Sequence, residues 1–191
     1  MPTLVMMHGM TGTSEMMRPF AEKVLPEGWN LLVPQAEFSH PNRGYTWWRY
    51  EGGDNPGRRI LTAKELSDVD SSLLKLVNQL PDDELVLGGF SQGGAMAQEL
   101  LQFDLDVIGI IAIGTRVVRP LELKSRLTEI EQNNLFWMHG ESDHRVSLEA
   151  GLEIPELFED AGWEVHRIQH HKGHMIPIEY HENLKDWLQN L

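Results

Sequence analysis

A serine between glycines is the residue of this chain best suited to covalent chemistry. The sequence Gly-Phe-Ser-Gln-Gly at 89–93 follows the apolar run 85–87 and precedes a helical pattern that starts at residue 94. A serine on a tight turn from a buried strand into a helix forms the arrangement called a nucleophile elbow. The helix N-terminus beneath such a serine offers backbone N–H groups to the charge on an attacked carbonyl oxygen. The pattern therefore indicates nucleophilic catalysis by Ser91.

Two loops further along the chain carry an acid and a base that could activate Ser91. A serine hydroxyl is a poor nucleophile until a base takes its proton, and that base needs a third group to fix its tautomer. Asp143 ends the sequence His-Gly-Glu-Ser-Asp at 139–143, and His174 follows the next strand-like run at 164–168. Serine, acid and histidine, each after a strand, is a known order for such a triad. We therefore expect Ser91, Asp143 and His174 to act together.

Both partners of the serine have alternatives. Glu141 lies two residues closer to the preceding strand than Asp143, and it is a rival for the role of acid. An aspartate in a loop most often caps a turn or helix, and His174 could equally begin a helix or lie on the surface. The joint appearance of both residues in the expected order and positions favours the triad.

An acyl-transfer site also needs two backbone N–H donors for the developing oxyanion. The residue after the nucleophile, Gln92, is expected to supply one, and the loop after the first strand-like run the other. That loop reads His-Gly-Met-Thr-Gly-Thr at 8–13, and its glycines let the backbone turn toward the serine. Met10 is the first choice for the donor and Thr11 the second, while His8 is expected to be structural. The sequence thus predicts an oxyanion hole formed by Met10 and Gln92.

A regular alternation of strands and helices must position these loops. Short runs that are apolar on both faces predict strands covered by helices on both sides, at 4–7, 31–33, 85–88, 107–113, 135–138 and 164–168. Helical patterns lie around and between them, at 15–25, 62–79, 92–102, 121–131, 148–161 and 176–188. The alternation predicts an α/β fold with a doubly wound, mostly parallel sheet of about six strands. Sites in such sheets form at the carboxyl ends of the strands, which is where the three loops fall.

Two of the predicted helices carry distinctive signals. Thr62 and Glu65 have the spacing of a capping box at the start of the helix at 62–79. Pro155 lies inside the predicted helix at 148–161. We expect it to kink or split that helix, because proline removes a backbone hydrogen bond.

One segment breaks the alternation, because residues 34–61 show little periodicity and contain Trp47 and Trp48. Long loops are usually functional or disordered, and the aromatic residues argue against disorder. We expect a wall of a substrate pocket, with packing of both tryptophans against the domain edge as an equal alternative. Thr11 and Met175 are further candidates for substrate contact, since methionine suits an adaptable apolar acyl pocket.

Length and composition restrict the class of protein. The 191 residues suit one domain spanning 1–191, with no internal repeat or linker. The absence of cysteine removes disulfides and thiolate nucleophiles, and no basic leader or long apolar run is seen. We therefore expect a cytoplasmic protein without stable membrane insertion. The net charge of −13 repels phosphate backbones, so no nucleic-acid partner is expected.

Metal and nucleotide chemistry are competing interpretations of the histidines and glycines. His170, His171 and His174 are close in sequence, but no His-Glu-x-x-His pattern occurs and thiolate ligands are absent. No Gly-x-Gly-x-x-Gly follows the first strand-like run, and no Gly-Lys-Ser or Gly-Lys-Thr occurs. We expect neither a metal nor another cofactor.

The blocks that carry these residues resemble the phospholipase/carboxylesterase family, which includes acyl-protein thioesterases, within the α/β-hydrolase superfamily. The resemblance spans nearly the whole chain, and Gly-Phe-Ser-Gln-Gly-Gly at 89–94 is its most specific part. It implies a single-domain α/β-hydrolase fold and, because the chain is short for the family, a reduced or absent lid. It also implies a substrate-loop tryptophan at Trp47 or Trp48. It places the nucleophile, acid, base and two oxyanion donors on the residues already singled out: Ser91, Asp143, His174, Met10 and Gln92.

The sequence thus predicts a serine hydrolase of the carboxylesterase or thioesterase kind. Its expected substrate is a small acyl ester or thioester, cleaved through an acyl-enzyme intermediate. Two alternatives stay open: a catalytically silent binding protein that kept the fold, and peptidase or perhydrolase activity at the same triad. We expect a monomer or a homodimer.

Overall fold

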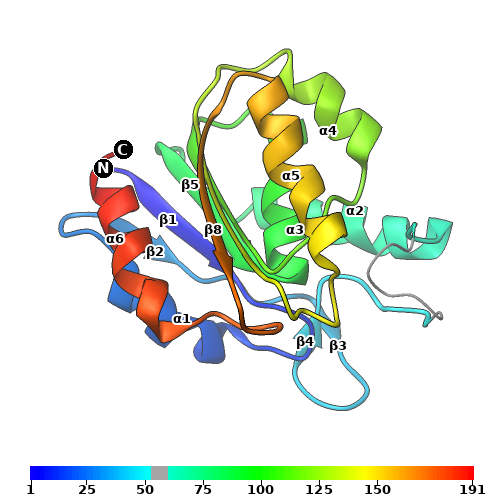
Figure 1. Cartoon of the computed structure of the whole chain (residues 1–191). Coiled ribbons are helices and arrows are strands. Elements are labelled where there is room, and N and C mark those ends of the chain that lie inside the picture. Colours follow the sequence, from blue (N-terminus) through cyan, green and yellow to red (C-terminus); the bar gives the residue numbers. More distant parts are fainter. Residues whose placement is uncertain (53–59) are drawn as a thin grey trace.

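A computed structural model of the chain describes residues 1–52 and 60–191, and among these a parallel sheet forms the centre (Figure 1). The sheet has six strands in the order β2-β1-β5-β6-β7-β8, and every neighbouring pair is parallel. The strands are β1 (Thr3–Met7), β2 (Asn30–Leu32), β5 (Leu85–Phe90), β6 (Val107–Ile113), β7 (Asn134–Gly140) and β8 (Glu164–His170). Each of the six predicted strands is present, so the prediction of an α/β fold with a parallel sheet is confirmed.

Helices cover both faces of this sheet, as its apolar strands require. The helices are α1 (Ser14–Val24), α2 (Ala63–Val77), α3 (Gln92–Glu99), α4 (Pro120–Leu127), α5 (Leu148–Asp160) and α6 (His181–Gln189). Figure 1 shows α1 and α6 on one face and α2, α3, α4 and α5 on the other. The pleat of β1 separates the two layers, because Leu4 and Met6 join the cluster under α1 and α6, whereas Val5 and Met7 join the other.

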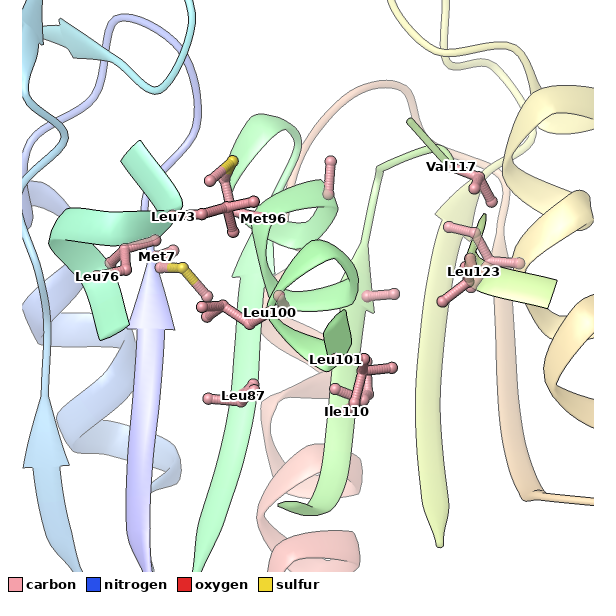
Figure 2. Close-up of a cluster of buried hydrophobic side chains, with 14 of the residues drawn as sticks. Met7, Leu73, Leu76, Leu87, Met96, Leu100, Leu101, Ile110, Val117 and Leu123 are labelled. Atoms are coloured by element: carbon pink, nitrogen blue, oxygen red, sulfur yellow. The ribbon is translucent and has the colours of Figure 1, made fainter. Parts of the chain in front are cut away.

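The larger of the two hydrophobic clusters contains the helix α3, which follows the central strand β5. Met96 of α3 and the adjoining Leu100 are buried with Leu73 and Leu76 of α2 and with Met7 of β1 (Figure 2). Burying a leucine or methionine side chain stabilises the fold by roughly 1.5–3 kcal/mol relative to exposure. This packing fixes the N-terminus of α3 at the carboxyl ends of β1 and β5.

The start of α2 confirms the predicted capping box. The Thr62 hydroxyl accepts the Glu65 N–H at 3.2 Å, and a Glu65 carboxylate oxygen accepts the Thr62 N–H at 2.9 Å. Two of the N–H groups that a helix start leaves without intrahelical partners are satisfied in this way.

Helix α5 runs unbroken past Pro155, so the helix is not split there, and the alternative expectation of a kink stays a prediction. Proline at this position cannot donate to the carbonyl of Gly151, one turn earlier. The indole Nε1–H of Trp137 on β7 donates to that carbonyl at 2.9 Å. The sheet therefore supplies the hydrogen bond that the helix lacks.

Three predicted helices differ from the observed elements at their ends. The helix expected at 92–102 divides into α3 and a 3₁₀ turn at Leu100–Gln102. The helix expected at 176–188 begins with a 3₁₀ turn at Ile178–Tyr180 before α6. Helix α4 ends at Leu127 instead of residue 131, and the chain continues in turns with i to i−3 hydrogen bonds. Tightening of terminal turns is common and leaves little trace in hydrophobic periodicity.

The segment at 34–61 contains a small hairpin that the sequence analysis did not predict. Its strands are β3 (Phe38–Ser39) and β4 (Tyr45–Thr46), which pair antiparallel. Tyr45 also pairs with the loop after β1, where it accepts the Thr11 N–H at 2.9 Å and donates to the Gly12 carbonyl at 3.0 Å. Strands of two residues are too short to show alternation, which explains the omission. Residues 53–59 of this segment lie outside the described residues.

In the described part of the chain, no helix has the length and hydrophobicity needed to cross a bilayer.

Candidate active site

Ser91 occupies the turn between β5 and α3 with φ 54° and ψ −119°, a conformation that side chains other than glycine rarely adopt. Its N–H donates to the Ile113 carbonyl at 2.9 Å, and the Thr115 hydroxyl donates to its carbonyl at 2.6 Å. The neighbouring glycine at position 93 is required, because a Cβ there would overlap the carbonyl of Met7. The strain, about 1–3 kcal/mol for such a residue, is thus held in place by both neighbouring strands.

His174 links Ser91 to Asp143. Nε2 of His174 lies 3.1 Å from Oγ of Ser91, and Nδ1 lies 2.7 Å from Oδ2 of Asp143. The other carboxylate oxygen of Asp143 accepts the backbone N–H groups of Arg145 at 2.8 Å and Val146 at 2.9 Å. One oxygen of the Asp143 carboxylate is therefore bound by its own loop, and the other faces the imidazole of His174. With the proton on Nδ1, Nε2 is free to accept the serine proton.

The charge of Asp143 suits this arrangement. Burial raises the pKa of this carboxyl. The hydrogen bonds from His174 and from the N–H of Val146 lower the pKa by more than burial raises it, so it lies below its ordinary value. Asp143 is therefore ionised at neutral pH and can stabilise a positive charge on His174.

Glu141, the rival acid, lies elsewhere. Its side chain is exposed, and Oε1 accepts the Gln169 side-chain amide at 2.9 Å. The geometry therefore favours Asp143 as the partner of His174.

His139 supports the loop of the acid, a role that the sequence analysis missed. Its ring is fully buried and stacks on Trp137, with the ring centroids 5.8 Å apart. Nε2 donates to the Val146 carbonyl at 2.9 Å and lies 3.7 Å from Oδ2 of Asp143. Burial lowers the pKa of His139, so the ring beneath Asp143 is neutral at pH 7.

The two predicted oxyanion donors line the same pocket as Ser91. The backbone N–H groups of Met10 and Gln92 make no hydrogen bond within the described residues, and both residues line the same pocket as Ser91. Thr11, the second choice, has its N–H bonded to the Tyr45 carbonyl. The geometry therefore favours Met10 over Thr11 as the donor from this loop.

The side chain of Gln92 fastens the hairpin segment to the nucleophile turn. Oε1 of Gln92 accepts the Trp47 N–H at 3.0 Å and lies 2.8 Å from the Thr46 hydroxyl. Nε2 donates to the Trp48 carbonyl at 3.2 Å. Gln92 thus follows Ser91 at the pocket and holds the hairpin segment through its side chain. Motif spacing alone did not reveal this second role.

The two tryptophans of the 34–61 segment differ in their surroundings. Trp47 is 1% exposed, and its indole donates to the His8 carbonyl at 2.7 Å. Trp48 lines the pocket. Both tryptophans are therefore buried in the core, as the alternative interpretation held, but only Trp48 also lines the pocket over Ser91 among the described residues. Met175 is 42% exposed and, like Trp47, is absent from the described pocket lining. Contact of either residue with a substrate stays a prediction.

A pocket of about 770 Å³ opens over Ser91. The sequence analysis anticipated Met10, Thr11, Trp48, Ser91, Gln92 and His174 among its lining residues. The segment expected to form a pocket wall also contributes His40, Asn42, Arg43 and Tyr50, and the motif around the serine contributes Phe90. Arg116, Arg145 and Val146 line the pocket without having been anticipated there. Phe90 packs on the His174 ring, with centroids 4.7 Å apart, and helps to hold the imidazole in place.

His8 has the structural position that we expected. Its Nδ1 donates to the Gly9 carbonyl at 2.8 Å, and Nε2 accepts the Ala36 N–H at 3.1 Å. Burial lowers the pKa of His8, which keeps the ring neutral. The residue joins the loop after β1 to the segment after β2.

The histidines considered as metal ligands are dispersed. Within residues 1–52 and 60–191, no three His, Asp or Glu side chains gather in a way that could hold a metal ion. His170 stacks on Tyr180 with centroids 6.1 Å apart, His171 is exposed, and His174 faces Ser91.

A strained serine after a central parallel strand, hydrogen-bonded to a histidine after the last strand, defines the α/β-hydrolase class. Solved structures share the fold. Esterase PE8 has a TM-score of 0.79 at 23% identity, covering 99% of this chain and 92% of that one. Acyl-protein thioesterase 2 of Zea mays has a TM-score of 0.75 at 18% identity, covering 99% and 93%.

Sequence comparison identifies the family. The profile of the phospholipase/carboxylesterase family matches residues 1–191, and the chain belongs to this family. Acyl-protein thioesterase 1 of Neurospora crassa is 30% identical over 114 residues, which cover 57% of this chain and 46% of that relative. The alignments span less than half the length of the curated relatives that match.

Proposed function

We propose that the protein is a serine hydrolase that cleaves acyl esters or thioesters through Ser91, His174 and Asp143. The observation that carries the proposal is the continuous hydrogen-bonded path from Ser91 Oγ through the imidazole to Asp143, which starts at a pocket lined by Ser91 and His174. Membership of the phospholipase/carboxylesterase family and the likeness to a named thioesterase support the choice of an acyl substrate.

In the first half-reaction, Ser91 Oγ attacks the carbonyl carbon while His174 Nε2 takes its proton. The oxyanion accepts the N–H groups of Met10 and Gln92, and each such donor contributes about 10²–10³ in rate in comparable sites. Asp143 stabilises the imidazolium. The carbon–oxygen or carbon–sulfur bond then breaks, and the leaving group receives the proton from His174.

In the second half-reaction, water replaces the leaving group. His174 takes a proton from that water, and the resulting hydroxide attacks the acyl group on Ser91. Collapse of the second tetrahedral intermediate returns the proton to Ser91 and releases the carboxylic acid. This chemistry uses only the side chains and backbone N–H groups of the site.

Hydrolysis of p-nitrophenyl esters with acyl chains from two to ten carbons, together with an acyl thioester, tests the proposal. We expect the wild type to hydrolyse at least one of these esters or thioesters and Ser91→Ala to lower kcat by at least about a thousandfold, because the covalent route is lost. Ser125→Ala, an exposed serine on α4, is the matched control and should keep wild-type activity.

Two outcomes would redirect the assignment. If neither turnover nor labelling of Ser91 by a fluorophosphonate occurred, the fold would instead serve as a binding protein. If labelling occurred without turnover of esters or thioesters, the same triad would act on peptides or another narrower class of substrate.

A further inference from the structure

Positive charge gathers around the pocket over Ser91. Arg43, Arg116 and Arg145 line it, and none of its described lining residues is aspartate or glutamate. The three arginines come from separate segments: the turn between β3 and β4, the loop after β6 and the loop after β7. This composition is opposite in sign to the chain as a whole, whose net charge is −13.

Among the described residues, two of these arginines have no carboxylate partner. Other arginines of the described chain form ion pairs: Arg18 with Glu22, Arg49 with Asp68, Arg119 with Glu99 and Arg167 with Glu159. Within residues 1–52 and 60–191, the side chains of Arg43 and Arg145 make neither an ion pair nor a hydrogen bond. Each guanidinium therefore keeps the donor fork that matches a carboxylate or a phosphate.

The backbones that carry these arginines are fixed beside the reacting groups. The N–H of Arg145 donates to Oδ1 of Asp143 at 2.8 Å, so its position depends on the acid loop itself. Arg43 precedes Gly44, which has φ 61° and packs so closely on the Thr11 carbonyl that a Cβ would overlap it. Both arginines thus line, from anchored backbone, the pocket that Ser91 also lines.

From this placement we infer that the pocket selects esters or thioesters bearing a carboxylate or phosphate remote from the scissile carbonyl, and that Arg43 and Arg145 bind this group. The inference rests on the hydrolase function proposed above. A pocket of about 770 Å³ has room for a substrate that extends from Ser91 to the arginines. The anionic group could belong to the acyl part or to the leaving group, and the same arginines would attract either.

Paired substrates that differ only in charge test the inference for the acyl part and for the leaving group of the ester. On the acyl side, the p-nitrophenyl monoester of adipic acid is compared with its neutral methyl diester. On the leaving-group side, 4-carboxyphenyl butyrate is compared with its neutral methyl ester. Each pair is measured with the wild type, Arg43→Gln, Arg145→Gln and the double variant. Arg18→Gln with Arg167→Gln removes the same charge from the surface and is the matched control.

We expect the ratio of kcat/KM for the anionic over the neutral ester to fall at least about fivefold in the double variant for one pair. The control should keep the wild-type ratio, and the wild-type preference should weaken as salt is raised. The pair that responds shows which part of the substrate carries the anion.

An unchanged ratio in both pairs, with neutral esters still cleaved, would overturn the inference and leave the hydrolase function intact. If the wild type cleaved none of the four esters, the hydrolase function would lose support and calorimetry with free adipate and inorganic phosphate would decide the inference. Binding of either anion that weakens in the double variant would support it, and absence of binding would refute it.

Discussion

At the scale of single residues, the geometry of the site depends on the neighbours that hold Ser91 and His174 in place. Ser91 keeps its strained conformation because Ile113 and Thr115 bond its backbone on both sides. His174 is held between Phe90 and Asp143. A serine hydrolase needs this fixed geometry, because misplacement by 1 Å can cost about 10²-fold in rate.

Replacing Asp143 by asparagine tests the assignment of the acid. Asparagine can still accept the N–H groups of the loop through its oxygen, but its amide would favour the wrong tautomer of His174. We expect kcat to fall by about 10⁴, as in comparable triads. Glu141→Gln is the matched control and should keep at least half of the activity; a larger loss from that variant would reassign the acid.

Wild type and Asp143→Asn should also differ in how their stability depends on pH. The folded pKa of Asp143 lies below its ordinary value, so its ionised form stabilises the fold above the unfolded pKa, and this contribution is lost as pH falls through the folded pKa. The difference in free energy of unfolding between wild type and Asp143→Asn should therefore shrink on acidification from pH 7 toward pH 3. Denaturant unfolding measures it, and a difference that grew with acid would contradict this account.

Gln92→Met tests whether the side chain after the nucleophile holds the pocket wall. The variant keeps the volume and the backbone donor but leaves the buried Trp47 N–H without its acceptor. We expect a loss of about 1–3 kcal/mol in the free energy of unfolding and a raised KM, while fluorophosphonate still labels Ser91. Gln189→Met, an exposed position at the end of α6, should change neither quantity. An unchanged KM in Gln92→Met would show that the pocket wall forms without the Gln92 side chain.

At the scale of elements, the sheet compensates for a defect in a helix. Pro155 removes the N–H that would bond the Gly151 carbonyl, and the Trp137 indole takes its place. Helix α5 can thus carry proline and still pack on β7, directly behind the strand that leads to Asp143. Sequence reasoning sees the proline but not the partner, because Trp137 lies far from it along the chain.

A double-mutant cycle measures this compensation. Trp137→Phe leaves the Gly151 carbonyl unsatisfied and loses packing, whereas Pro155→Ala restores an N–H one turn later in the helix. We expect Trp137→Phe to cost about 1 kcal/mol less free energy of unfolding in the Pro155→Ala background than in the wild type. Equal costs in the two backgrounds would show that the indole contributes only its packing.

At the scale of the whole molecule, the elements that follow from local sequence patterns could be predicted. The contacts between residues far apart in the sequence could not. The six strands and the loops of Ser91, Asp143 and His174 were predictable, because buried strands are continuously apolar and their carboxyl ends share one edge. The separation of Trp47 from Trp48 was not, since it depends on Gln92, more than forty residues away.

The distribution of charge also appears only in the folded molecule. Composition gives −13 and suggests repulsion of anions, yet folding brings Arg43, Arg116 and Arg145 to one pocket. Net charge describes long-range steering, while the selectivity of a site depends on the few charges that line it.

The central claim, that Ser91 is the nucleophile, is tested most directly by covalent labelling with a fluorophosphonate followed by peptide mass spectrometry. The account predicts one adduct per chain, located on Ser91 and absent from Ser91→Ala, with labelling slowed in Asp143→Asn. An adduct on another residue, or equal labelling of wild type and Ser91→Ala, would contradict it.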